Sequence, residues 1–177
     1  EVGSETKQGA ASTFLYDTLT RLCAALGMDG SEYRRLVASS FLVSCDNAHA
    51  VHPNHGEFAD RNHTARMNGG VVIKYNANQR YTSDAVSAGI FRRICESAGV
   101  PVQYYANRAD MPGGSTLGNI SNTQVSLNAV DIGLAQLAMH SPFETAGAAD
   151  TASLVKALTA FFEHSLVAER DGVYRFL

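Results

Sequence analysis

The chain has 177 residues, enough for one ordinary domain or for part of a larger one, and too few for two full domains. With 45% hydrophobic and 18% charged residues, and no apolar run near the roughly 20 residues that a bilayer needs, it is neither disordered nor membrane-spanning. The formal net charge of -3 provides no basic stripe for phosphates, which argues against nucleic acid as a partner.

The cysteines indicate the cellular compartment, and the first residues indicate how the chain begins. Cys23, Cys45 and Cys95 form no CxxC pair, so they predict neither a disulfide framework nor a thiolate zinc site. We therefore expect a reducing compartment, the cytoplasm. The sequence opens at Glu1 without an initiator Met or an apolar leader, and we interpret this start as a cut inside a longer chain.

Helices and strands are predicted alternately along the first half. Apolar residues three and four apart predict a helix over residues 9–26, and Ser31 starts a shorter one. Residues 41–45 are a brief apolar run that is typical of a buried strand and delivers Asp46 at its end. The polar stretch 47–68 holds four histidines and has no clear period, which predicts a long, functional loop.

The second half continues this alternation. The predicted elements are strands at 70–75, 102–105 and 129–133 and a helix at 86–98. The glycine-rich segment 110–118 predicts a turn whose hydroxyls cap a short helix. Residues 141–144, Ser-Pro-Phe-Glu, form a capping box with Pro at the first helical position, so we expect the last helix to start at Pro142. Residues 166–177 are a tail without an assignment.

The alternating elements predict an α/β fold, in which a mostly parallel or mixed sheet is sandwiched by helices. Sites in such sheets gather at the carboxyl ends of strands, which is where Asp46 is expected. The sequence shows no internal repeat, low-complexity tract or linker, so one compact layered structure is predicted.

A cluster of possible metal ligands lies in the predicted loop. Asp46, His49, His52 and His55 fall within ten residues, and a carboxylate beside imidazoles is a ligand mix that zinc or manganese accepts. Pro53 interrupts the stretch, so the three histidines cannot share one face of a helix. A solvated polar loop is the alternative interpretation.

Three further side chains are candidates from their positions. His140 lies between a buried segment and the predicted last helix, either as a ligand or as a half-buried, hydrogen-bonded histidine. Lys74 interrupts an apolar strand and Tyr81 follows seven residues on, a cation and a phenol that could bind an anionic group. The alternative for Lys74 is an edge-strand lysine that discourages sheet pairing. Residues 113–116 lack the spacing and the Lys of a phosphate loop.

Several separated stretches occur in the order of a known family. They are Glu1-Val2-Gly3-Ser4-Glu5 with Gly9-Ala10, Cys45-Asp46-Asn47-Ala48-His49-Ala50-Val51-His52-Pro53-Asn54, Val72-Ile73-Lys74-Tyr75-Asn76 with Gln79-Arg80-Tyr81, Asp110-Met111-Pro112-Gly113-Gly114-Ser115-Thr116-Leu117-Gly118, and Gln136-Leu137-Ala138-Met139-His140-Ser141. Together they resemble the aspartyl aminopeptidase family of zinc metallo-aminopeptidases, from residue 1 to about residue 163.

The resemblance implies a two-zinc site in which a bridging water, its pKa lowered by the metals, attacks the first peptide bond of a substrate. Carried over by motif, Asp46 would be a ligand of one zinc, and Glu1 and His140 would be ligands of the other. The same donors accept manganese or cobalt, so the metal identity stays open. The family also assembles into large homo-oligomers.

The resemblance also implies substrate contacts by His49, Lys74 and Tyr81. Family members prefer peptides with an acidic N-terminal residue, Asp or Glu, and Lys74 is the cation for that carboxylate. Tyr81 or His49 could steady the scissile carbonyl while charge develops on its oxygen.

One departure from the family concerns the start of the chain. The family has two consecutive glutamates, and Glu1 corresponds to the second, so the general base expected just before Glu1 is not in this chain. The family's N-terminal histidine, bridging aspartate and inserted dimerisation domain are missing too. We expect residues 1–177 to be the C-terminal part of a catalytic domain, inactive when isolated and completed by the N-terminal part of the same protein.

Two alternatives to an active enzyme remain. The chain could be a catalytically inactive fragment that acts only as a folding or assembly unit, because losing a bridging carboxylate and a base removes water activation. A weaker possibility is a mononuclear hydrolase built from Asp46, His49 and His140 without a partner.

Overall fold

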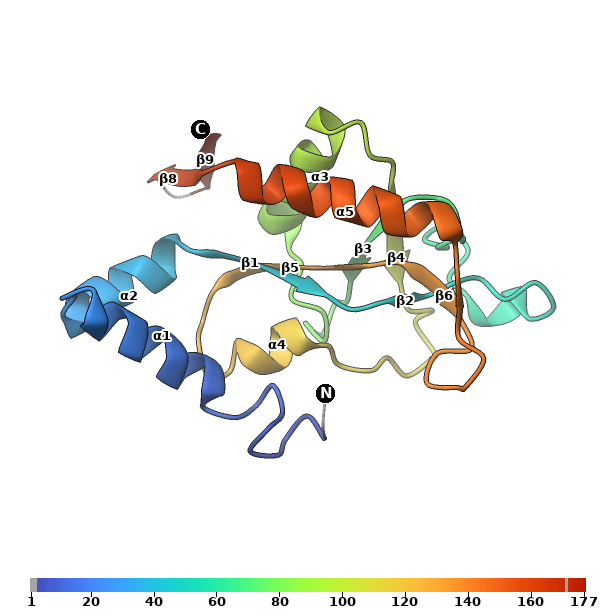
Figure 1. Cartoon of the computed structure of the whole chain (residues 1–177). Coiled ribbons are helices and arrows are strands. Elements are labelled where there is room, and N and C mark those ends of the chain that lie inside the picture. The colour runs from blue at the N-terminus through green and yellow to red at the C-terminus, as the bar shows by residue number, and fades with distance from the viewer. Residues whose placement is uncertain (1–2, 171) are drawn as a thin grey trace.

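The structure is a computed structural model that describes residues 3–170 and 172–177. Its centre is a four-stranded sheet in the order β1-β5-β3-β4 (Figure 1). The strands are β1 (Phe41–Cys45), β3 (Val71–Tyr75), β4 (Val102–Ala106) and β5 (Asn128–Gly133). β1 pairs in parallel with β5, and β3 with β4, whereas β3 and β5 are antiparallel. The predicted α/β fold is therefore confirmed, with a mixed sheet.

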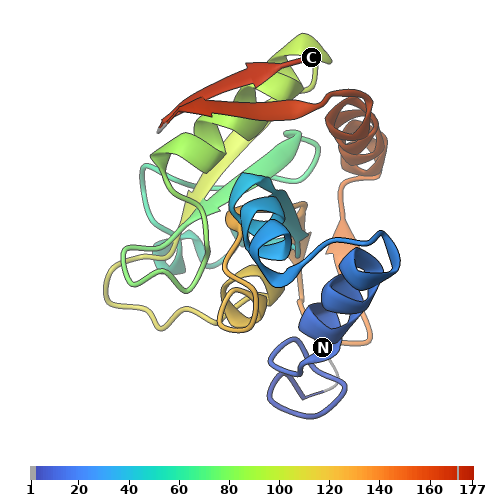
Figure 2. The same cartoon turned by 90° about the vertical axis from the view of Figure 1, so that its left-hand side faces the viewer.

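Helices cover both faces of this sheet. The two long ones, α3 (Ala85–Ser97) and α5 (Ala148–Glu163), lie on one face, and the short α4 (Leu117–Ser121) lies on the other (Figures 1 and 2). Two more helices, α1 (Phe14–Ala25) and α2 (Gly30–Ser39), precede β1. None of the helices in the described ranges has both the length and the apolar character needed to cross a bilayer.

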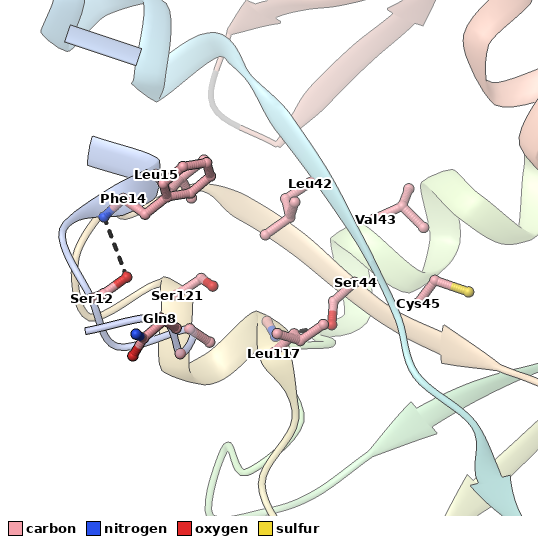
Figure 3. Close-up of a pocket in the computed structure, with 13 residues that line it drawn as sticks. Gln8, Ser12, Phe14, Leu15, Leu42, Val43, Ser44, Cys45, Leu117 and Ser121 are labelled. Atoms are coloured by element: carbon pink, nitrogen blue, oxygen red, sulfur yellow. Dashed lines mark hydrogen bonds between the residues drawn. The ribbon is translucent and has the colours of Figure 1, made fainter. Parts of the chain in front are cut away.

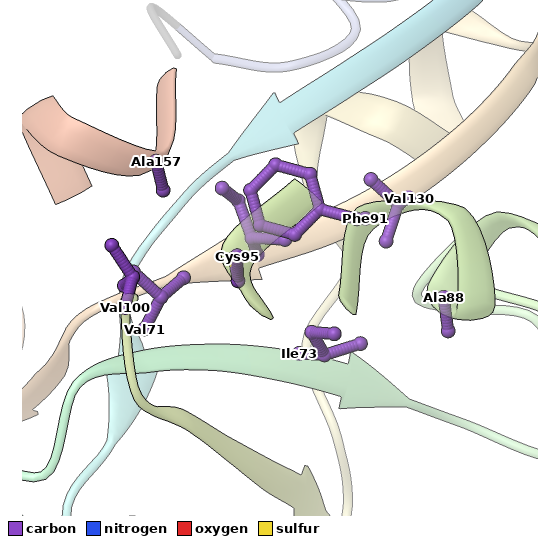
Figure 4. Close-up of a cluster of buried hydrophobic side chains, with 9 residues drawn as sticks. Val71, Ile73, Ala88, Phe91, Cys95, Val100, Val130 and Ala157 are labelled. Carbon is purple, nitrogen blue, oxygen red and sulfur yellow. The ribbon is translucent and has the colours of Figure 1, made fainter. Parts of the chain in front are cut away.

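The main hydrophobic core lies between the sheet and the two long helices. Phe91 and Cys95 of α3 and Ala157 of α5 have no exposed surface, and they pack against Val71 and Ile73 of β3 (Figure 4). Successive side chains of a strand point to opposite faces, so alternate residues of β3 and β5 supply this core. On the other face, Val72 of β3 packs in a second cluster with Tyr81 and Tyr105, and Asp131 of β5 binds the hydroxyl of Thr116 at the start of α4.

A second, smaller sheet continues the first. Its strands, in the order β2-β6-β7, are β2 (Ala48–His49), β6 (Ala135–Leu137) and β7 (Thr145–Ala146). Since β2 follows β1 and β6 follows β5, the parallel pairing of β1 with β5 carries on into β2 and β6. The predicted loop 47–68 is mostly irregular, but it contains β2 and the 3-10 helix η1 (Gly56–Phe58).

The tail that the sequence left unassigned is an antiparallel hairpin of β8 (Leu166–Arg170) and β9 (Val173–Phe176). Its apolar residues Leu166, Tyr174 and Phe176 pack against Ile90 and Ile94 of α3. The tail thus extends the apolar layer on the side of the long helices.

Two helix boundaries differ from the prediction. The last helix begins at Ala148, because Glu144 of the expected capping box binds the backbone N–H of His140 instead and β7 intervenes. The first helix begins at Phe14 rather than residue 9, because the backbone N–H of Ala11 donates to the carbonyl of Ser4 and curls this segment into turns. The expected short helix after the glycine-rich segment is confirmed as α4; at its start the backbone N–H of Thr116 donates to the side chain of Asn119 at 3.0 Å, and the hydroxyl of Thr116 donates to Asp131.

Candidate active site

Asp46 immediately follows β1, at the carboxyl end of that strand as expected. Its backbone N–H donates to the carbonyl of Ile132 at 2.9 Å, which holds it beside the end of β5. A Cβ atom built on Gly133 would overlap the carbonyl oxygen of Asp46, so this close approach requires glycine. The position of Asp46 is therefore fixed by its backbone.

The side chain of Asn47 connects the segment after β1 to the start of β6. Its side-chain oxygen accepts a hydrogen bond from the N–H of Leu134 at 3.1 Å, and its amide nitrogen donates to the side chain of Gln136. These bonds carry the chain from β1 into β2, where His49 pairs with Gln136 and its side chain is exposed. His49 is thus presented three residues after Asp46 by a strand and not by a loose loop.

His140 lies in a tight turn after β6. Ala138 and His140 both have positive φ, 55° and 68°, a backbone conformation that residues other than glycine rarely adopt. The turn is closed by a hydrogen bond from the N–H of Ser141 to the carbonyl of Ala138 at 3.0 Å. The N–H of His140 donates to Oε1 of Glu144 at 2.6 Å. His140 is exposed, so the alternative of a half-buried core histidine is wrong.

Lys74 is buried in the middle of the sheet, with 1% of its surface exposed. The edge-strand alternative is wrong, because β3 lies between β5 and β4. The Nζ atom donates to the carbonyl oxygen of Asp46 at 2.7 Å and lies 5.0 Å from the ring centre of Tyr81. Lys74 therefore connects two of the other candidate residues.

Tyr81 is nearly buried, with 5% exposed. Its ring packs against Tyr105 with 6.3 Å between centroids. Burial raises the pKa of the Tyr81 hydroxyl, so the phenol keeps its proton at neutral pH and remains a hydrogen-bond donor.

Asp131 of β5 is a buried carboxylate that the sequence analysis did not single out. One oxygen, Oδ2, accepts hydrogen bonds from the backbone N–H of Thr82 at 2.5 Å and from the hydroxyl of Thr116 at 2.8 Å. Continuing the β3–β5 register places Asp131 opposite Lys74 on the same face. Oδ1 is buried without a hydrogen-bond partner among the described residues. The available signal was an acidic residue that interrupts an apolar strand, as Lys74 does.

The pKa of His49 responds to three of the other candidate residues. Its pKa is lowered first by burial and then by His140 and Lys74, and Asp46 partly opposes this shift. Screening by water and salt limits such interactions to roughly 10 Å, so side chains from β2, β3 and the turns after β1 and β6 lie within about that distance of His49. The structure thus gathers Asp46, His49, Lys74 and His140 from four separate segments.

The remaining loop histidines form local pairs. The rings of His52 and His55 lie 5.1 Å apart, and His55 is 3.1 Å from the carboxylate of Glu57. His63 lies 3.0 Å from Asp60. These exposed pairs agree with the solvated-loop interpretation for this part of the cluster.

The expected ligand Glu1 lies outside the described residues. Within 3–170 and 172–177, no three side chains of His, Cys, Asp or Glu are arranged to hold a metal ion. Asp46 and His140 supply a carboxylate and an imidazole, donors that fit zinc. The described chain therefore contains two of the three expected ligands.

One cavity lies beside the candidate site, and a second lies elsewhere on the surface. A cavity of about 360 Å³ is lined by His49, Tyr105 and Ala138, next to the gathered side chains. Another, of about 350 Å³, lies between α1, β1 and α4 (Figure 3). There Leu42 and Ser44 line it from β1, and none of the candidate site residues does.

The sequence of the chain is similar to those of several known proteins. Residues 1–162 match the family described as aminopeptidase I zinc metalloprotease (M18). A probable M18 family aminopeptidase 2 of Pseudomonas aeruginosa is 48% identical over 165 residues, 93% of this chain and 38% of the relative. A probable aspartyl aminopeptidase of Ricinus communis is 43% identical, over 92% of this chain and 33% of the relative.

Solved structures show the same fold. An Ape4 chain, from a complex with Nbr1, superposes with a TM-score of 0.88 at 39% identity, over 92% of this chain and 31% of that one. The S. cerevisiae mApe1 dodecamer gives a TM-score of 0.78 at 27% identity, over 92% of this chain and 36% of that one. The chain therefore spans well under half the length of these relatives. Because the family match covers most of its residues, the chain belongs to the M18 family of aminopeptidase I zinc metalloproteases.

Proposed function

We propose that the chain is the C-terminal part of the catalytic domain of a metallo-aminopeptidase that removes acidic residues, Asp or Glu, from the N-termini of peptides. The observation that carries the proposal is the gathering of Asp46, His49, Lys74 and His140 at one place. The zinc metalloprotease family and the relative named aspartyl aminopeptidase support it.

Asp46 and His140 would hold the metal, with Glu1 as a third ligand. We propose two zinc ions per complete site, with manganese or cobalt as alternatives, because the same oxygen and nitrogen donors accept them. A bound metal would supply a water of lowered pKa for the attack on the first peptide bond. The other ligands and the general base would come from the part of the family's sequence that this chain does not span, since it covers 38% of the Pseudomonas relative.

His49 and Tyr81 would act on the scissile carbonyl. The lowered pKa of His49 keeps its ring neutral, with one N–H to donate, and the raised pKa of Tyr81 keeps its hydroxyl protonated. A donor aimed at an oxygen on which charge develops stabilises the transition state. Either residue can fill this role without changing its own protonation.

Lys74 would provide the preference for acidic residues. Its ammonium lies beneath the site on the carbonyl of Asp46, so it would attract a substrate carboxylate through a region of low dielectric. Lys74→Met keeps most of the length of the side chain and removes the charge. We expect hydrolysis of aspartyl and glutamyl anilides to fall far more than hydrolysis of leucyl anilide. An equal loss on all three would contradict this role.

The central test uses the complete protein that contains this chain. Asp46→Ala should abolish hydrolysis of an aspartyl anilide and lower the bound zinc, while the circular dichroism spectrum stays unchanged. Near-normal turnover of this variant would remove Asp46 from the metal site. If the complete wild-type protein binds no metal and cleaves nothing, the chain is a folding or assembly unit instead.

We also propose that the protein works as a homo-oligomer in a reducing compartment, the cytoplasm. The dodecamer formed by the related S. cerevisiae mApe1 supports the first statement. The free thiols of Cys23, Cys45 and Cys95 support the second.

A further inference from the structure

Two cavities adjoin beside the candidate site. The first, of about 360 Å³, opens at His49, and the second, of about 500 Å³, is lined by the turn after β3 at residues 76–80. Asn107, Met111 and Pro112 line both cavities, so the two meet over the segment that follows β4. They form one path that leads away from His49.

The second cavity carries positive charge. Arg80 and Arg108 line it, and no Asp or Glu is among the described residues that do so. The guanidinium of Arg108 is engaged, because it donates to the carbonyl of Glu57 and pairs with Asp110 at 2.6 Å. The guanidinium of Arg80 makes no hydrogen bond or ion pair with any described residue. Arg80 is therefore available to an anion in this cavity.

The backbone that presents Arg80 is held in a defined turn. The side-chain oxygen of Asn76 accepts hydrogen bonds from the N–H of Asn78 at 2.9 Å and from the N–H of Arg80 at 3.3 Å. Gln79 has a positive φ of 56°. These contacts fix the base of the Arg80 side chain and leave its head free to bind.

We propose that the second cavity binds a carboxylate of the peptide substrate, downstream of the bond that is cut, with Arg80 as its cation. This inference rests on the proposed function, which places the first residue of the substrate at His49. Every peptide ends in a carboxylate, and a guanidinium binds that group through two parallel hydrogen bonds. An extended peptide advances roughly 3.3 Å per residue, so the length of the substrate decides whether its C-terminal carboxylate reaches Arg80.

The test measures kcat and KM of the complete protein on peptides of two to five residues with an acidic first residue. Each peptide is supplied with a free and with an amidated C-terminus. For the length that reaches Arg80, we expect the free acid to have a KM roughly tenfold lower than the amide, as for one hydrogen-bonded charge pair. Arg80→Gln should abolish this difference, and Arg80→Lys should restore part of it.

Arg93→Gln is the matched control, since Arg93 is an exposed arginine on α3. A second series places Glu or Gln at the third or fourth position of amidated peptides, which distinguishes a side-chain carboxylate from the C-terminal one. A preference in either series that Arg80→Gln removes supports the proposal. If Arg80→Gln leaves both series unchanged, or wild type shows no preference in either, the proposal is wrong.

Hydrolysis of an aspartyl anilide separates this inference from the proposed function, because that substrate has no downstream carboxylate. Failure of wild type to cleave the anilide would overturn the proposed function. Cleavage of the anilide by wild type and by Arg80→Gln, without any effect of Arg80 on the peptide series, would overturn only the carboxylate site.

Discussion

On one face of the central sheet, β3 and β5 bury only apolar side chains, whereas on the other face they bury charged ones as well. Under α3 and α5, Ile73 and Ile132 pack in an apolar core with Phe91. On the other face, alternate positions of the same strands bury Lys74 and Asp131. Because successive residues of a strand point in opposite directions, one pair of strands builds both environments.

The comparison assigns different tasks to the two faces. The apolar face removes hydrocarbon from water and so supplies stability. Burying a charged group costs free energy unless the group has hydrogen-bond partners, and both buried charges have them here. Lys74 donates to Asp46, and Asp131 accepts from Thr82 and Thr116. The polar face therefore positions the segments around the site on a sheet that the apolar face holds together.

The largest effect should come from the centre of the apolar face. Phe91 has no exposed surface, so Phe91→Ala should lower the free energy of unfolding by about 3–5 kcal/mol, measured by urea titration. Phe162→Ala is the control, since Phe162 is 79% exposed and its loss should cost within about 0.5 kcal/mol. Equal effects of the two substitutions would contradict this assignment of the core.

A smaller effect is expected on the polar face at Asp131. Asp131→Ala leaves the half-buried N–H of Thr82 and the buried hydroxyl of Thr116 without their acceptor, at a cost of about 2–4 kcal/mol. Hydrogen exchange should accelerate at the amide of Thr82 before it does so in α3. Asp110→Ala removes an exposed carboxylate instead and should leave the stability unchanged. Unchanged protection of Thr82 in the Asp131 variant would refute the anchoring role.

The third prediction concerns the junction where β5 meets Asp46. In Gly133→Ala the new methyl group would overlap the carbonyl of Asp46, and we expect a loss of about 1–3 kcal/mol together with lower metal binding in the complete protein. Gly89→Ala is the matched control, because Gly89 lies within α3 with open space around its Cα. That change should stabilise the protein by about 0.5–1 kcal/mol. The idea fails if both alanine variants bind metal equally well.

The smallest effect concerns the reactivity of two thiols, one in the apolar core and one at the edge of the sheet. Burial raises the pKa of Cys95 to about 12, and Cys95 has no exposed surface. Cys45 is exposed at the edge strand β1, although burial of its sulfur also raises its pKa. Since only the thiolate reacts, Cys45 should react first with a disulfide reagent, at a rate that keeps increasing above the ordinary thiol pKa.

Cys45→Ser provides the control for this measurement and should remove the early phase of the reaction. Modification of Cys95 in the native protein at a similar rate would show that the apolar face opens readily. The raised pKa of Cys95 also means that the stability it contributes is present below the ordinary thiol pKa and declines as the pH rises toward about 12.

Much of the fold could be predicted because its signals are local. The apolar runs at β1, β3 and β5 and the periodic stripe of α3 each depend on residues close together in the chain. The capping box of α2, between Asp29 and Glu32, is equally local. For the site, motif order nominated Asp46, His49, Lys74, Tyr81 and His140, while Asp131 and Arg80 became visible only with their neighbours in place.

The start of α5 shows why a local signal can fail. Residues 141–144 have the form of a helix cap, but Glu144 binds the N–H of His140 in the turn. The helix begins later, where the side chain of Asn68 accepts from the N–H of Ala149 at 3.1 Å and Asp150 accepts from the N–H of Asn68 at 2.6 Å. A helix cap that comes from about 80 residues away cannot be predicted from the residues around the start of the helix.

The sequence by itself determined the strands of the central sheet, most of the helices, the family resemblance and the candidate residue types, because periodicity, capping and motif order are properties of neighbouring residues. Only the tertiary structure decided that β3 runs against β5, that Lys74 is buried instead of lying at an edge, and that its ammonium reaches Asp46. Strand direction and burial depend on which distant segments pack together, and that choice minimises the exposed apolar area of the whole chain while it satisfies its buried polar groups.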